Sequence, residues 1–340
     1  MPSDDPPSYA DMLATPAEAL EARFGTSPEE AARWARKLAL TGSPAGIVQF
    51  GNMLLIGHGM AADPPAALRW FRIGAEAGDP ECANMVGRCH ELGMGTAVDP
   101  AEAARWFRLA ADKNHAWALF NLGCLYLAGR GVPADRREAL ALFVHSARRG
   151  NAKAMNMLGR YCEEGWTGRR KIAAARRWYR RAAEGGCFRG LFHSGRFMLM
   201  DDNPERAAEL FSQSVAIAPP DFCRDAGAML IGHPAEAIRA VAFTALERAC
   251  ESGEAGDFHA FGKALALSTP LDENRKEQAI LWLSCARKAG FADPEDHLGH
   301  LLDGQPLRQA SLALSDAAGR ITGAVKRVRS KGDGARYRRG

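Results

Sequence analysis

Aromatic, small and apolar residues recur along this chain at fixed spacings that indicate repeated pairs of helices. One repeating position, here called the Trp position, is occupied by Trp34, Trp70, Trp106, Leu142, Trp178, Leu210, Ala245 and Trp282. Eight residues after it stand Gly42, Gly78, Asn114, Gly150, Gly186, Ala218, Gly253 and Gly290. Glycine and asparagine there favour the left-handed conformation that ends a helix. Seventeen residues after it stands an invariant glycine, here called the A-helix glycine: Gly51, Gly87, Gly123, Gly159, Gly195, Gly227, Gly262 and Gly299.

The spacing varies only between each A-helix glycine and the next Trp position. This stretch has 19 residues in the first four copies and 15, 18 and 20 in the next three. Because loops tolerate insertions and packed helices do not, a loop lies inside it, and each unit is predicted to be helix A, loop, helix B. The first three loops carry Gly-x-Gly followed by Asp63, Asp99 or Asp135, which we expect to cap helix B.

The stretches ALFNLGCLYLAGRGVPADRREALALFVHSARRG (118–150) and AKAMNMLGRYCEEGW (152–166) carry this pattern most clearly. They resemble the Sel-one-like repeat family, relatives of tetratricopeptide repeats, and the resemblance extends over about residues 28–305. It implies an all-α fold, a right-handed α-solenoid superhelix of helix-turn-helix repeats of about 36 residues. The units at 195–218, 227–253 and 262–290 lack the Gly-x-Gly loop, and the Trp position weakens there to Leu210 and Ala245.

Four segments follow from this pattern. We expect an acidic, proline-rich N-terminal segment (1–27), the solenoid (28–306), an amphipathic helix (307–329) and a basic tail (330–340). The apolar residues of the third segment stand at helical spacing: Leu314, Ala317, Ile321, Val325 and Val328. This helix either caps the last repeat or docks on a membrane or a partner.

Positive charge is concentrated in two places, although the net charge of the chain is only +4. Arg320–Gly340 holds eight Lys and Arg residues against one acid. Such a tail is either solvated or binds nucleic acid or anionic lipid. Arg130–Arg181 holds fourteen basic residues against four acids, which indicates a solvated outer face or an acidic partner.

The resemblance implies that helix A lines a concave inner surface. Residues three and two places before the A-helix glycine, and the residue after it, are then expected to face inward; they are called positions −3, −2 and +1. These positions mix Asn, Phe, His and Arg, as a binding surface does. The candidate binding residues are Asn84, Arg88, Phe120, Asn121, Asn156, Arg160, Phe192, His193 and Arg196. Each of them could also simply face water.

Candidate chemistry is sparse. HExxH, GxSxG and phosphate-loop patterns are absent from the sequence. Cys89 with His90, and His297 with His300, each supply two possible metal ligands without a third at a usual spacing. The eight cysteines form no CxxC pair and are expected to be reduced. We therefore expect no enzyme activity, no cofactor and no metal.

The chain begins without the basic and apolar segments of a secretory signal. A cytoplasmic location is the expectation, and export through an uncleaved signal remains open. We expect a non-catalytic adaptor that binds an acidic protein or peptide, with Arg supplying bidentate contacts to carboxylates. An effector or a toxin-neutralising protein is a variant of this function. The alternative function is an anionic-surface binder that uses Arg320–Gly340.

Overall fold

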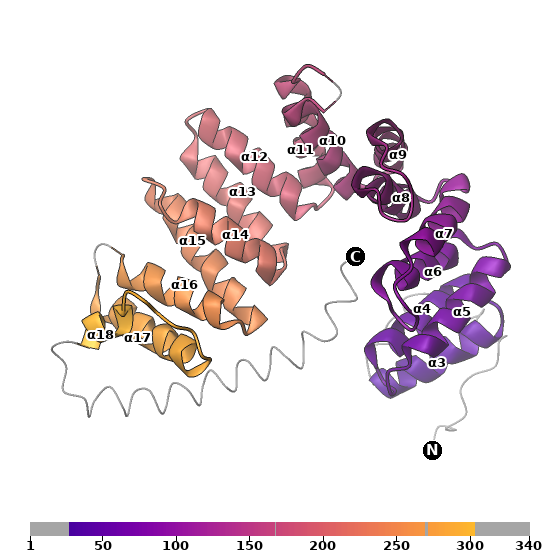
Figure 1. Cartoon of the computed structure of the whole chain (residues 1–340), viewed down its shortest axis with the longest axis horizontal. Helices are drawn as coiled ribbons and strands as arrows, with labels where there is room; N and C mark the ends of the chain where they lie inside the picture. Colours follow the sequence, from indigo (N-terminus) through magenta and orange to yellow (C-terminus); the bar gives the residue numbers. More distant parts are fainter. Residues whose placement is uncertain (1–26, 167, 269–270, 303–340) are drawn as a thin grey trace. The chain divides into compact units, whose positions relative to one another are not determined.

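The computed structural model describes residues 27–166, 168–268 and 271–302, and every regular element in this part of the chain is a helix. Helices B and A alternate along the sequence, as Figure 1 shows. The B helices are α3 Pro28–Leu40, α5 Pro64–Glu76, α7 Pro100–Asp112, α9 Arg136–Arg148, α11 Ile172–Glu184, α13 Pro204–Ile217, α15 Glu236–Ala249 and α17 Glu273–Lys288. The A helices are α4 Pro44–Ile56, α6 Pro80–Leu92, α8 Ala116–Ala128, α10 Ala152–Glu164, α12 Phe188–Met200, α14 Pro220–Leu230, α16 Ala255–Ala266 and α18 His297–Leu302.

This order confirms the predicted α-solenoid of helix-turn-helix repeats. Every Trp position lies on a B helix and every A-helix glycine on an A helix. A single 3₁₀ turn, η1 Cys250–Ser252, extends α15. The predicted amphipathic helix 307–329, the basic tail 330–340 and residues 1–26 of the N-terminal segment lie outside the described residues.

The helix ends predicted after the B helices are formed in the first units, where Gly42, Gly78 and Asn114 have φ 79°, 92° and 60°. Gly57, Gly93 and Gly129 end their A helices at φ 69°, 72° and 65°. The Asp63 carboxylate accepts a hydrogen bond from the backbone N–H of Ala66 at 2.9 Å and so caps α5. Asp99 and Asp135 cap α7 and α9 in the same way. These caps place the start of each B helix directly after its loop.

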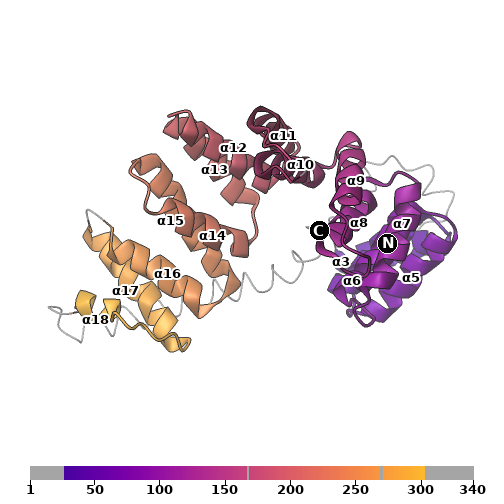
Figure 2. The same ribbon diagram turned by 45° about the horizontal axis from the view of Figure 1, so that its top comes forward.

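The described residues fall into two compact units, 27–175 and 176–302, whose boundary lies inside α11. In the second unit the pairs α12/α13, α14/α15 and α16/α17 pack in succession, and Figure 2 shows these pairs from a second direction. Each unit has its own core, centred on residues from both helices of each pair.

The core of each repeat is built around the residue that follows the Trp position. Phe71, Phe107, Phe143, Tyr179 and Phe211 are fully buried there, at 0% exposure. The Trp side chain itself is only partly buried in Trp70, Trp106 and Trp178. In the four phenylalanines the buried ring lies against the A-helix glycine, where no Cβ atom separates it from the helix backbone. The glycine is therefore required by close packing rather than by an unusual backbone angle.

Helices of the same repeat and of neighbouring repeats also contact each other through a second set of small residues. A Cβ atom on Gly95 would lie 2.3 Å from the carbonyl oxygen of Pro64, at the start of the preceding B helix. The Ser146 hydroxyl donates to the carbonyl of Ala116 at 2.7 Å, and Ser214 donates to Phe188 at the same distance. Small residues at these positions let successive helices approach closely. None of the described helices has the length and apolar character needed to cross a membrane.

Candidate functional site

Positions −3, −2 and +1 of the A helices differ in exposure. At position −3, Asn84 and Asn156 are each 3% exposed and Phe192 is 4% exposed. Phe192 packs against Phe211 and Phe222, with ring centroids 4.9 and 5.4 Å apart. These three side chains are inaccessible to a ligand, which corrects the expectation that they line an open surface.

Position −3 instead connects one repeat to the next. The side-chain amide of Asn121 donates to Asn84 Oδ1 at 3.1 Å, which joins α8 to α6. Arg224 of α14 binds the carboxylate of Asp257 on α16 through Nε and Nη2, the latter at 2.7 Å. Asp257 is only 2% exposed. Asn84 and Arg224 are thus satisfied by the neighbouring repeat, whereas Asn156 Oδ1 and His259 Nε2, at the same position, are buried without a hydrogen bond to any described residue.

The other predicted aromatic and polar residues remain partly exposed. Phe120 packs edge-on against Trp117 at 6.2 Å and against Phe143 at 5.8 Å. His193 stacks on Tyr179 with ring centroids 4.4 Å apart. Phe120, His193 and Asn121 are each partly exposed to solvent.

The three predicted arginines have different local partners. Arg160 donates to Glu164 at 3.2 Å and lies over the Trp166 ring at 5.3 Å. Arg196 Nη1 lies 2.8 Å from His193 Nδ1, which must accept the hydrogen bond because a guanidinium only donates. Arg88 is partly exposed and forms no ion pair with any described residue. Arg88 is therefore the cation of this set that is most available to a partner's carboxylate.

A cavity of about 700 Å³ opens in the second unit between α14, α15, α16 and α17. The open positions of helix A reach it: Ala228 and Lys263 at position +1 and Ala260 at position −2. Its remaining lining residues are Ile231, Gly232, Glu236, Arg239, Ala240, Phe243, Leu246, Ala264, Leu267, Ser268, Asp272 and Arg275.

The cavity combines apolar side chains with charged groups that are held in place. The Arg275 guanidinium lies over the Phe243 ring at 5.6 Å. Arg239 Nη1 donates to the carbonyl of His233 at 3.0 Å, and Lys263 Nζ lies 2.8 Å from Glu295 Oε2. An apolar lining with a few oriented polar groups is typical of ligand sites in proteins.

Burial lowers the reactivity of the Cys89 and Cys124 thiols. All eight cysteines are free thiols. Burial raises the pKa of Cys89 and of Cys124 to about 12, so both stay protonated at neutral pH and are poor nucleophiles. His90, beside Cys89, is buried and has Arg72 Nη2 3.1 Å from its Nε2.

The Sel1 repeat family model matches residues 48–79, 80–115, 118–151 and 152–187. Residues 48–187 are therefore four repeats of the Sel1 repeat family. Sel1 repeat proteins generally act as scaffolds for protein interaction and are typically non-catalytic. The units before and after these four Sel1 repeats keep the same order of helices.

A solved Sel1 repeat protein has a similar fold. A Sel1 repeat protein from Oxalobacter formigenes is 21% identical and matches 80% of this chain and 97% of its own, with a TM-score of 0.56. A protective antigen of uropathogenic Escherichia coli with an SLR fold is 21% identical over 96% of this chain and 85% of its own, at a TM-score of 0.42. An immunity protein from Pseudomonas aeruginosa is 16% identical and matches 67% of this chain and 89% of its own, with a TM-score of 0.43. No curated protein gives a significant match.

The cavity lies in Sel1-like units whose sequence motifs are weak, and so sequence analysis placed the candidate site earlier in the chain. One feature of the sequence does indicate the cavity. The repeats that form it carry Ala260 at position −2 and Ala228 at position +1, where earlier repeats carry Asn121 and Arg88. Small side chains at open positions leave space between helices.

Proposed function

We propose that this Sel1 repeat protein is a non-catalytic scaffold that binds an extended segment of a partner protein at the open positions of its A helices. The cavity between α14 and α17 carries this proposal, because positions −2 and +1 line it. Such a segment would place apolar side chains against Ile231 and Phe243 and polar groups against the surrounding charges.

The partner segment is proposed to carry carboxylates. Arg88 offers a partly exposed guanidinium with no ion pair among the described residues, and a guanidinium binds carboxylates in a bidentate manner. Arg160 and Arg196 contribute less, because Glu164 and His193 already engage them. The acidic character of the partner therefore depends most on Arg88.

Affinity purification from the native cell with two matched pairs of variants tests this function. Ala240 and Ala237 are both exposed on α15, but only Ala240 lines the cavity. We expect Ala240→Trp to lose the captured partner and Ala237→Trp to keep it. Arg88→Glu should weaken capture, whereas Arg69→Glu, with the same charge change on a B helix, should not. Equal capture by both members of both pairs would contradict the proposal.

The alternative function, binding to nucleic acid or anionic lipid, depends on Arg320–Gly340, which lies outside the described residues. Deleting 330–340 tests it. Loss of co-sedimentation with anionic vesicles or nucleic acid, with partner capture unchanged, would favour an additional anionic-surface role.

A further inference from the structure

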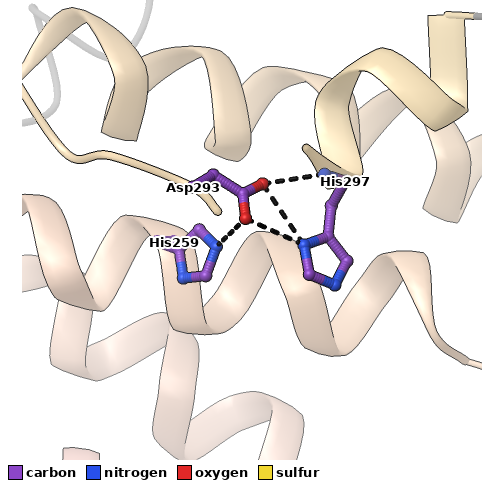
Figure 3. Close-up of side chains that lie close together, drawn as sticks. All are labelled: His259, Asp293 and His297. Atoms are coloured by element: carbon purple, nitrogen blue, oxygen red, sulfur yellow. Dashed lines mark hydrogen bonds and ion pairs between the residues drawn. The ribbon is translucent and has the colours of Figure 1, made fainter. Parts of the chain in front are cut away.

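Two histidines and one aspartate converge at the end of the second unit. His259 lies on α16, Asp293 lies in the segment that joins α17 to α18, and His297 is the first residue of α18. Figure 3 shows the Asp293 carboxylate between the two imidazole rings, each with a nitrogen facing it. One donor atom from each residue lies within 4.8 Å of the others.

The distances between the possible ligand atoms are close to those around a tetrahedral metal ion. Asp293 Oδ1 lies 3.3 Å from His259 Nε2 and 3.1 Å from His297 Nδ1. Ligands about 2.0–2.1 Å from a tetrahedral Zn²⁺ are about 3.3 Å from each other. A point midway between donors 4.8 Å apart is about 2.4 Å from each, so closing the sphere takes shifts of a few tenths of an ångström.

The histidine nitrogen of α16 needs a partner. His259 Nε2 is buried, and although it is 3.3 Å from Asp293 Oδ1 it makes no aligned hydrogen bond with any described residue. Its ring stacks on Phe291 with centroids 4.3 Å apart, which holds the ring in orientation. A buried nitrogen that faces a carboxylate without a well-aligned hydrogen bond would gain a bond from a metal ion bound between them.

The surrounding groups prepare His297 and Asp293 as ligands. Glu295 Oε2 lies 2.9 Å from His297 Nε2, the outer ring nitrogen, as outer carboxylates do at histidine-metal centres. The backbone N–H of His297 donates to Asp293 Oδ2 at 2.8 Å, which holds the carboxylate in place between the two rings.

We propose that His259, Asp293 and His297 bind one divalent transition-metal ion, Zn²⁺ in particular, with a water molecule in the fourth position. The ion would fasten residues 291–297 to α16 and so hold the end of the second unit closed. Two neutral imidazoles and one carboxylate suit Zn²⁺ better than Mg²⁺ or Ca²⁺, which prefer oxygen ligands.

Titration of the chelator-treated, reduced full chain with Zn²⁺, followed by calorimetry, tests the site. We expect one ion per chain and a higher midpoint of thermal unfolding. His259→Ala, Asp293→Asn and His297→Gln should each weaken binding by about 100-fold or more, since outer-shell changes alone cost about 10- to 100-fold. The matched controls His300→Gln and Asp296→Asn, in the same segment, should bind like the unaltered protein.

Co²⁺ spectroscopy on the unaltered protein gives a readout that does not depend on the variants folding. Tetrahedral coordination by nitrogen and oxygen gives visible bands without a thiolate charge-transfer band in the near ultraviolet. A thiolate band would place the ion at the cysteines and overturn the proposal. Absence of stoichiometric binding, or equal binding by the folded ligand variants and their controls, would overturn it as well.

Discussion

The Phe107 ring of α7 occupies the space that a side chain on Gly87 of α6 would need. A Cβ atom built on Gly87 would lie 2.6 Å from both Cδ1 and Cε1 of that ring. Gly51 with Phe71 and Gly123 with Phe143 repeat the contact. The A-helix glycine thus packs against the residue that follows the next Trp position, and this contact is made in successive repeats.

Gly87→Ala tests this contact. Alanine is the better helix former by about 1 kcal/mol, so propensity alone predicts stabilisation. We expect destabilisation of about 2 kcal/mol instead, because the added methyl group must displace the buried Phe107 ring. Urea denaturation measures it. Gly232→Ala is the control, since nothing lies within 4 Å of its added Cβ. Equal effects of the two substitutions would contradict the packing account.

Asp99→Ala should lower the free energy of unfolding of the first unit by about 1 kcal/mol. The substitution removes the acceptor of hydrogen bonds from Ala101 and Glu102, both at 3.0 Å. Asp112→Ala changes the same residue type at the other end of α7, where a negative charge is unfavourable. It should be neutral or slightly stabilising. Equal destabilisation by the two variants in urea would show that the cap is not the cause.

Arg224→Ala should destabilise the second unit by about 3–5 kcal/mol, because it leaves the buried Asp257 carboxylate unpaired. Glu254→Ala removes the exposed partner of the same arginine and should cost less than about 1 kcal/mol. A double-mutant cycle with Asp257→Ala measures the coupling. Additive effects of Arg224→Ala and Asp257→Ala would contradict a direct contact between repeats.

The stability of the first unit should depend on pH through His90. Burial and then the Arg72 charge lower the pKa of His90 below its ordinary 6.5. The unfolded chain therefore binds the proton more readily, and the free energy of unfolding should fall as pH drops below about 6.5. His90→Gln should flatten this slope between about pH 5 and 7. Parallel profiles for the two proteins would rule out His90 as the cause.

Sequence spacing predicted the helices because the repeat preserves one packing contact even where motifs weaken. Gly227 still packs against Leu246 and Gly262 against Leu283, at 2.7 and 2.8 Å from an added Cβ. Spacing could not tell which of two adjacent aromatics is interior. Phe71 is fully buried whereas Trp70 is only partly buried, since successive residues differ by about 100° around a helix.

The sequence predicted the candidate site less completely than it predicted the fold. Asn84 and Asn121 differ by one place in the repeat, and only the packing of α6 against α8 makes the first buried and the second open. His259 and His297 come together from helices 38 residues apart, a separation that matches no local metal-binding spacing. Both the burial of Asn84 and the meeting of His259 with His297 depend on contacts between repeats, which the sequence pattern within one repeat does not show.

Photo-crosslinking in the native cell tests the central claim, that partners bind at the open positions of the A helices. A photoreactive residue replaces Ala228 or Lys263, which line the cavity, or Ala237, exposed on α15 and outside it. The account predicts one shared partner crosslinked from Ala228 and Lys263 and none from Ala237. A partner crosslinked from Ala237 alone would place binding on the B helices and contradict the account.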